Sequence, residues 1–224
     1  MENLNQITVL TGCYSLLFLL CLWVWKMKSE NSVSIKVMNG NWNLLHLRHA
    51  GGALIMALLP ALLLPVLPEY LLVWPDAVSV VQGLTLIATG LLLLALVINH
   101  RDRPSWEGYG YYKGASIHAT AHIVLRSLFL ICYEWFFRGC LLFCCISIFG
   151  TTAAIIINLV LYMFIHSFNG KKEMIGSIPF GLILCVFTVW YQSVWPAIFL
   201  HLLLSLSYES FLLQPFFKKS TTVL

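Results

Sequence analysis

Long apolar runs dominate this sequence and restrict the chain to one kind of fold. Of its 224 residues, 60% are hydrophobic and only 10% are charged, which is outside the usual range for soluble domains. Several runs reach the length of about 20 residues that an α-helix needs to cross a bilayer. Because a backbone in lipid must satisfy its own hydrogen bonds, the sequence predicts an all-α, polytopic transmembrane helix bundle. We expect about seven spans, at residues 7–25, 50–67, 77–98, 122–149, 151–168, 174–191 and 194–213.

Basic residues lie in alternate loops between these spans. Lysines and arginines follow the first, third, fifth and seventh spans, whereas the intervening loops contain none. Such an excess marks the cytoplasmic side of a membrane protein, so the sequence predicts an outside N-terminus and a cytoplasmic C-terminus. The first run lacks preceding basic residues and is long for the apolar part of a signal peptide, so we expect a retained span. The scattered basic residues give no indication of nucleic-acid binding; the expected surroundings are the lipid bilayer.

A carboxylate and a guanidinium stand inside one of the apolar runs. Between Ser127 and Gly150, the residues expected to carry charge are Glu134 and Arg138. Their i,i+4 spacing stacks them on one helical face, in the favourable order with the acid first. An unpaired charge at bilayer depth costs about 2.5–3.5 kcal/mol. We therefore expect a buried pair, which either only holds helices together or marks a functional site.

Two histidines also lie deep within expected spans. They are His166 and His201, and each has a polar residue four positions away on its own helical face, Tyr162 and Ser205 respectively. At about 1.5 Å of rise per residue, both histidines, Ser205 and Glu134 fall in the cytoplasmic half of the bilayer. Three helices are therefore expected to bring these groups around one polar cavity.

These residue types suit hydrolysis. A carboxylate in apolar surroundings is suited to take a proton from water, and a histidine can orient that water. Another polar pair can then hold the oxyanion of a tetrahedral intermediate. The same set of one glutamate and two histidines also resembles the ligands of catalytic zinc sites. Spacing alone leaves both possibilities open.

Other polar residues stand near the expected membrane boundaries. His118 and His122 have i,i+4 spacing, but no third ligand is close in sequence, so we expect an interfacial pair instead of a metal site. Arg126 stands where this helix should enter the membrane, and we expect its side chain to snorkel to the interface. We expect the remaining three histidines to face solvent or headgroups: His46, His49 and His100.

The seven cysteines all lie within apolar runs. They form no CxxC pair in a loop, so the sequence indicates neither a disulfide framework nor a zinc knuckle. We expect Cys140, Cys144 and Cys145 to pack as small apolar side chains.

Four segments in the second half of the chain carry a family resemblance. They are Glu134-Trp-Phe-Phe-Arg138-Gly139, the span that ends at His166, Gly176-Ser-Ile-Pro-Phe-Gly, and Ser193-Val-Trp-Pro-Ala-Ile-Phe-Leu-His201. Over about residues 115–210 the sequence resembles the CAAX protease and bacteriocin-processing family of intramembrane endopeptidases, whose motifs are EExxxR, FxxxH and HxxxN. The resemblance implies a helical core, a bacterial plasma-membrane location and a peptide or membrane-protein substrate, with no metal or other cofactor.

The resemblance also implies roles for the motif residues. In the family the first glutamate and the second-motif histidine activate water, and the third motif forms the oxyanion hole. Carried over to this sequence, the implied catalytic residues are Glu134, His166, His201 and Ser205, with Tyr133, Arg138 and Tyr162 in support.

The sequence departs from the family pattern at three positions. Tyr133 replaces the first glutamate, Tyr162 replaces the phenylalanine and Ser205 replaces the asparagine. A tyrosine hydroxyl can orient water but is a poor general base. Because neighbouring helix positions differ by about 100° in direction, Glu134 can take over the missing role only if the helix is rotated or shifted.

Three functions stay open on the sequence. The first is an intramembrane endopeptidase with a cytoplasm-facing cavity, and the second is an inactive family member that acts as a membrane scaffold or regulator of a partner protein. A small transporter would also place ionisable residues at mid-membrane depth, but the chain shows no paired inverted-repeat motif. The expected division is 1–114 for N-terminal spans and loops, 115–213 for the family core and 214–224 for a cytoplasmic tail.

The loop charges generate a topology prediction. A reporter fused after Leu224 should be active on the cytoplasmic side, and a cysteine placed at Asp76 should be labelled from outside. A fused reporter that is active only on the outer side would contradict the predicted orientation.

Overall fold

A computed structural model describes residues 2–27, 42–63, 115–217 and positions 81, 83, 85, 87, 88, 90 and 92. All of its elements in this part of the chain are helical, which confirms the predicted all-α class. The elements are α1 (Glu2–Lys26), α3 (Trp42–Leu63), α5 (Ala115–Glu134), η2 (Trp135–Leu141), α6 (Leu142–Phe149), α7 (Thr151–His166), η3 (Ser167–Asn169), α8 (Lys171–Tyr191) and α9 (Trp195–Phe217).

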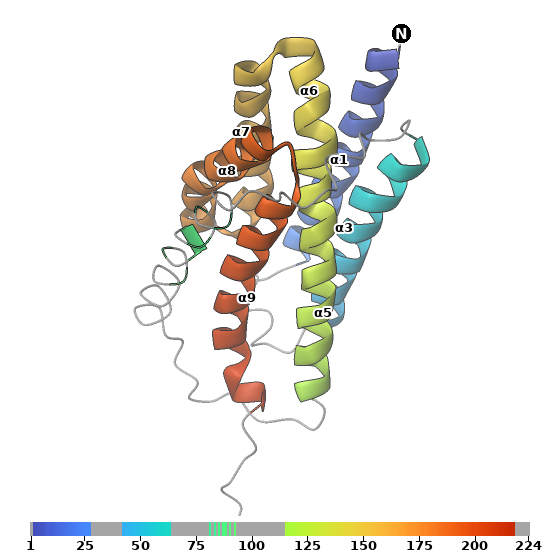
Figure 1. Ribbon diagram of the computed structural model, residues 1–224. Helices are drawn as coiled ribbons and strands as arrows, with labels where there is room; N and C mark the ends of the chain where they lie inside the picture. Colours follow the sequence, from blue (N-terminus) through green and yellow to red (C-terminus); the bar gives the residue numbers. More distant parts are fainter. Residues whose placement is uncertain are drawn as a thin grey trace, which may run out of the picture.

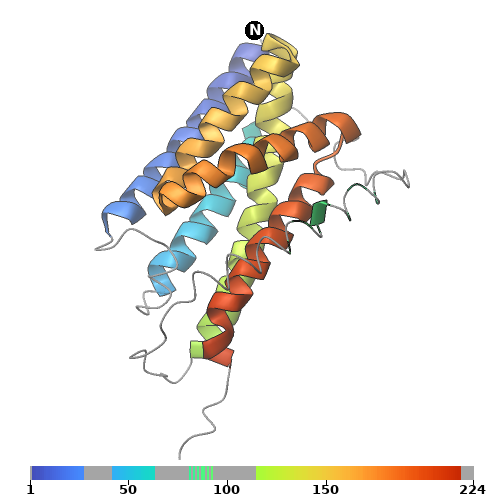
Figure 2. The ribbon, with the colours of Figure 1, turned by 90° about the vertical axis from the view of Figure 1, so that its left-hand side faces the viewer.

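One continuous helical rod, made of α5, η2 and α6, runs the length of the bundle (Figure 1). The helix α3 packs along α5 on one side and α9 packs along α5 on another, while α1 packs against α3. The helix α7 returns beside α6, and α8 packs against α7. From the second viewpoint, α8 slopes across the bundle before the chain turns into α9 (Figure 2).

Five helices are long and apolar enough to cross a membrane: Asn5–Lys26, Ser116–Phe149, Thr151–Asn169, Lys171–Tyr191 and Trp195–Leu213. The chain is therefore an integral membrane protein. The expected count of about seven spans is not confirmed. The expected second span corresponds to α3, which begins earlier, at Trp42, ends at Leu63 and is not one of the five. Most of the expected span 77–98 lies outside the described residues.

The core lies where α1, η2 and α7 meet. Aromatic side chains with at most 2% of their surface exposed gather there, among them Phe136, Phe137, Tyr133 and Tyr162. The seven cysteines are free. Of the three that were expected to pack as small apolar groups, Cys140 and Cys145 are buried and Cys144 is partly buried. Between α6 and α7 the chain reverses at Gly150, whose φ of 77° is a left-handed conformation that glycine adopts without strain.

Gly52 allows α3 to approach α5 closely. A Cβ atom at this position would lie 2.5 Å from Cε2 and 2.8 Å from Cδ2 of Phe129, whose ring is buried. By contrast, a Cβ atom at Gly12 in α1 would meet no described atom within 4 Å apart from the adjoining residues and backbone of its own helix. Close packing of α3 on α5 therefore requires a glycine at position 52, whereas α1 has room for a side chain at position 12.

We expect Gly52→Ala to lower the free energy of unfolding by about 1–3 kcal/mol, because the ring of Phe129 must move in a packed interior. The matched control Gly12→Ala should leave stability unchanged or raise it by about 0.5–1 kcal/mol, since alanine favours a helix. Thermal unfolding in detergent measures both. Equal effects of the two substitutions would contradict the close packing of α3 on α5.

Candidate active site

Glu134 is the last residue of α5, and its side chain is fully buried. Its two carboxylate oxygens face different partners. Oε2 lies 3.3 Å from Nε of Arg138, which confirms the expected i,i+4 pair, and Oε1 lies 2.5 Å from Nδ1 of His201. A single carboxylate therefore joins the continuous rod to α9. Glu134 therefore forms both the structural pair with an arginine and a contact with a histidine.

The helix changes its hydrogen-bonding pattern directly after Glu134. Trp135–Leu141 form a π-helix, at whose end the N–H of Leu142 donates to the carbonyl of Phe137, five residues earlier. A π-turn holds one residue more than an α-helical turn, so residues beyond it are rotated by about 100° relative to an uninterrupted α-helix. This shift begins only after Glu134, so it is not the rotation of Glu134 itself that would let this residue take over the missing role. It alters the direction of Arg138 and later residues, while Tyr133 and Glu134 keep their α-helical positions.

His201 lies in the second turn of α9, and its side chain is 10% exposed. A carboxylate can only accept a hydrogen bond from an imidazole N–H, so the contact with Glu134 places a proton on Nδ1 of His201. In the neutral ring, Nε2 then carries the lone pair. The pairing fixes both the tautomer and the direction of the ring.

His166, at the end of α7, shares this arrangement. Its Nδ1 lies 2.9 Å from the backbone carbonyl oxygen of Tyr162, which can only accept, so Nδ1 carries the proton here as well. The centroid of the half-buried His166 ring is 6.4 Å from that of His201 and 4.2 Å from that of Tyr162. The structure thus brings together the two histidines and Glu134, which come from three helices.

Two tyrosines complete this cluster. The ring of Tyr133 is buried, with its centroid 6.1 Å from that of His201 and 6.3 Å from that of His166. Its hydroxyl has no hydrogen-bond partner within the described part of the chain. The guanidinium carbon of Arg138 lies 4.2 Å from the centroid of the Tyr162 ring, which is cation–π distance and helps to hold this buried charge. All three expected supporting residues therefore lie in the cluster.

Ser205 lies one turn beyond His201, also buried, and is bonded to a residue of α5. Its hydroxyl accepts a hydrogen bond of 2.8 Å from Nε of Arg126. Arg126 also pairs with Glu209 at 3.3 Å and donates through Nη1 to Nε2 of His49 at 3.3 Å. Arg126 therefore has three partners on α3 and α9, while 18% of its side chain stays exposed, and its expected snorkelling to the interface stays a prediction.

Two of the histidines expected to be solvated, His46 and His49, lie in a second polar cluster between α3, α5 and α9. His49 is only 1% exposed, with its ring centroid 5.2 Å from that of His122, so its expected solvent or headgroup exposure is wrong. Burial, and then the nearby guanidinia of Arg126 and Arg48, hold the pKa of His49 well below its usual 6.5. A neutral His49 is the form that can accept a hydrogen bond from Arg126.

The pair of His118 and His122 is also partly buried in this cluster. Nε2 of His122 lies 3.2 Å from Oε2 of Glu209, and the ring of His118 stacks on that of His46 at 6.0 Å. Within the ranges that the structure describes, no group of three or more His, Cys, Asp or Glu side chains has an arrangement that could hold a metal ion. His100 lies outside those ranges.

Sequence reasoning assigned no role to two buried polar residues, Glu209 and Asn158. Both continue a helical stripe that starts from an expected site residue. Glu209 is four residues beyond Ser205 on α9, and Asn158 is four residues before Tyr162 on α7. The i,i+4 spacing of polar residues within apolar helices was therefore an available signal for both.

Residues 115–207 match the family model for the type II CAAX prenyl endopeptidase Rce1-like proteins. The resemblance expected from the motifs is thereby confirmed over that segment, which contains every residue of the cluster around Glu134. No curated protein and no solved structure matches the chain.

We expect Arg138→Ala to lower the free energy of unfolding by about 3–5 kcal/mol, because it leaves the buried carboxylate of Glu134 without its cation. The double variant Glu134→Gln with Arg138→Met should be less destabilised than Arg138→Ala alone, since no unpaired charge is left. Denaturant titration in detergent measures the difference. An Arg138→Ala variant with wild-type stability would contradict the buried pair.

Proposed function

Because residues 115–207 carry the signature of the Rce1-like family of type II CAAX prenyl endopeptidases, we propose that this protein is an intramembrane endopeptidase. The observation that carries the proposal is the bond between Glu134 and His201 with His166 beside it. Within a largely buried cluster, this arrangement supplies the imidazole of His201, which Glu134 orients, and the imidazole of His166, whose Nε2 carries the lone pair. This combination suits the activation of water for attack on a peptide carbonyl.

In the proposed reaction His201 is the general base. Its Nδ1–H is held by Glu134, so Nε2 takes a proton from water while the resulting hydroxide attacks the carbonyl carbon. Glu134 stabilises the imidazolium that forms, as carboxylates do beside catalytic histidines. This role differs from the expected one, in which glutamate itself takes the proton, because both oxygens of Glu134 already face other partners.

The tetrahedral intermediate requires a donor for its oxyanion. The Tyr133 hydroxyl is a suitable donor because it is buried, lies near both histidine rings and has no acceptor among the described residues. Ser205 is the family-implied donor, and its oxygen already accepts from Arg126, which leaves its own proton to donate. When the intermediate collapses, the C–N bond breaks and the proton on Nε2 of His201 passes to the leaving amine.

The proposed substrate is a membrane-associated peptide, reached from the cytoplasmic half of the bilayer. The matched family is named for prenyl endopeptidases that act at a CAAX sequence, so a prenylated peptide is the first substrate to test. We propose residues 115–213 as the catalytic core in a bacterial plasma membrane, with the N-terminus outside and the C-terminus in the cytoplasm.

A second candidate function is a membrane scaffold or regulator that binds a partner protein without hydrolysis. The observation in its favour is Tyr133, which stands where the family has a glutamate. The two functions make opposite predictions for the purified protein, since only the endopeptidase cleaves a peptide.

We expect the protein in lipid nanodiscs to cleave a quenched fluorescent peptide that ends in a prenylated CAAX sequence. Glu134→Gln should lower kcat by about 10⁴-fold, as loss of the carboxylate beside a catalytic histidine does elsewhere. Tyr133→Phe should lower kcat by about 100-fold, the cost of one oxyanion donor.

Ser147→Ala is the matched control, because this exposed hydroxyl donates to the Cys144 carbonyl within α6 and is bonded to no other helix among the described residues. Its activity should equal that of the wild type. A folded wild type that cleaves neither the prenylated peptide nor its unprenylated counterpart would contradict the endopeptidase and favour the scaffold.

A further inference from the structure

Asn158 is a buried amide in the middle of α7. The helix buries Ala154, Asn158, Tyr162 and Ile165, which form its inner face, and the other three carry apolar or aromatic groups. Asn158 is 0% exposed. A primary amide placed in such surroundings without hydrogen bonds would be costly, so its partners show what it is there to hold.

Both ends of the amide are engaged, on two different elements. Nδ2 donates to the backbone carbonyl of Phe137 at 2.7 Å, and Oδ1 accepts a hydrogen bond from Sγ of Cys185 on α8 at 3.4 Å. The carbonyl of Phe137 can only accept, so the amide nitrogen must face it. Asn158 thus links α7 to the π-helix η2 at its Phe137 position.

The Phe137 carbonyl forms one of the hydrogen bonds that distinguish the π-helix from an α-helix. It accepts from the N–H of Leu142 in the π-turn, whereas an uninterrupted α-helix would pair it with the N–H of Leu141. Asn158 adds a second donor to this carbonyl in the observed register. Because π-turns are rare and occur mostly as single turns at functional sites, such added support is expected where the turn is needed.

The next residue in the chain is Arg138, whose guanidinium meets Oε2 of Glu134, while Oε1 of the same carboxylate meets His201. The direction of Arg138 depends on the π-turn, so the orientation of the carboxylate depends on it too. We propose that Asn158 is a positioning residue, which holds the π-turn and thereby orients Glu134 toward His201. The effect of Asn158 on catalysis rests on the proposed endopeptidase function.

The test compares three variants by NMR of the full-length protein in detergent with ¹⁵N-labelled histidine. Asn158→Leu removes the donor at nearly constant size. Cys185→Ala removes the thiol that contacts Oδ1 and also lies beside Arg138, and Tyr14→Phe removes a different bond to α7, in which the Tyr14 hydroxyl donates to the Leu161 carbonyl at 3.0 Å. The readout is the Nδ1–H signal of His201, assigned by its loss in His201→Gln.

We expect the wild type, Cys185→Ala and Tyr14→Phe to keep the protected Nδ1–H signal and Asn158→Leu to lose it. In the peptidase assay, Asn158→Leu should lower kcat by about 100-fold, because a displacement of about 1 Å at reacting groups has that effect, while KM changes little. If Asn158→Leu does not accumulate, Asn158→Ala removes the same donor and carries the same expectation.

An unchanged His201 signal in the folded Asn158 variant would overturn the proposal, and a loss of thermal stability alone would not support it. The NMR measurement does not depend on hydrolysis. A wild type without peptidase activity would therefore contradict the proposed function, while the His201 signal would still decide whether Asn158 positions Glu134.

Discussion

The fold of this protein depends on one buried carboxylate. Glu134 is fully buried among apolar helices, where an unpaired charge is strongly unfavourable. Two partners compensate it, Arg138 from the same rod and His201 from α9. Removal of Arg138 would leave the charge uncompensated, and removal of His201 would leave Oε1 without its hydrogen-bond donor, so the helices that supply them must stay together. The hydrogen bond between Glu134 and His201, which holds α9 against α5, also fixes the tautomer of His201.

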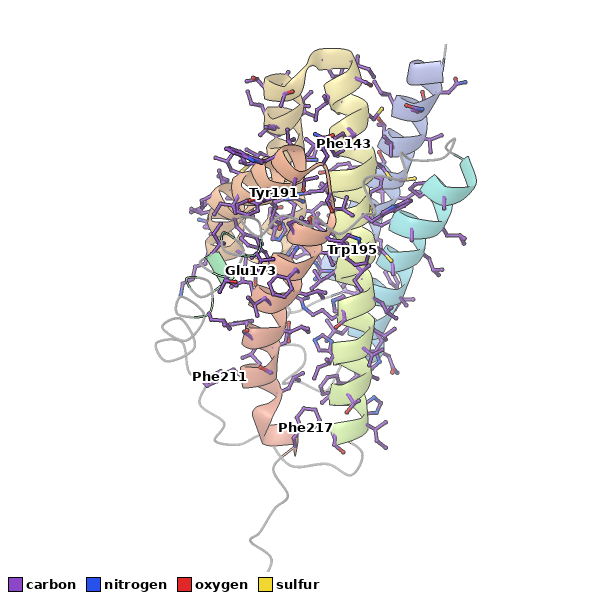
Figure 3. The ribbon with its side chains drawn as sticks, in the orientation of Figure 1. Phe143, Glu173, Tyr191, Trp195, Phe211 and Phe217 are labelled. Carbon is purple, nitrogen blue, oxygen red and sulfur yellow. The ribbon has the colours of Figure 1, made fainter. Side chains whose placement is uncertain are left out.

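A series of polar contacts extends this pairing along the interface between α5 and α9. From the Glu134–His201 bond, the contacts continue through Arg126 with Ser205 and end at His122 with Glu209. In a bundle whose outer faces are apolar, helices gain little from hydrophobic association alone, so polar contacts between them provide specificity. Figure 3 shows the side chains between these two helices, with Trp195 at the start of α9.

The sequence predicted the parts of the site that follow from local spacing. The i,i+4 separation of Glu134 and Arg138 predicted their pair, and depth within the spans predicted that His166 and His201 would lie close together. The π-turn after Glu134 was not predicted, because nothing in the local sequence distinguishes it and its support comes from Asn158, on another helix. Similarly, His49 was assigned to solvent because its burial depends on the packing of α3 against α5.

Glu134 and His201 interact as a pair in the folded protein. A double-mutant cycle with Glu134→Gln, His201→Gln and the combined variant measures that interaction as the deviation from additivity in the free energy of unfolding. We expect a coupling free energy between the two side chains of about 0.5–3 kcal/mol, the range for residues in direct contact. Effects that add to within about 0.5 kcal/mol would contradict it, since residues without contact behave in that way.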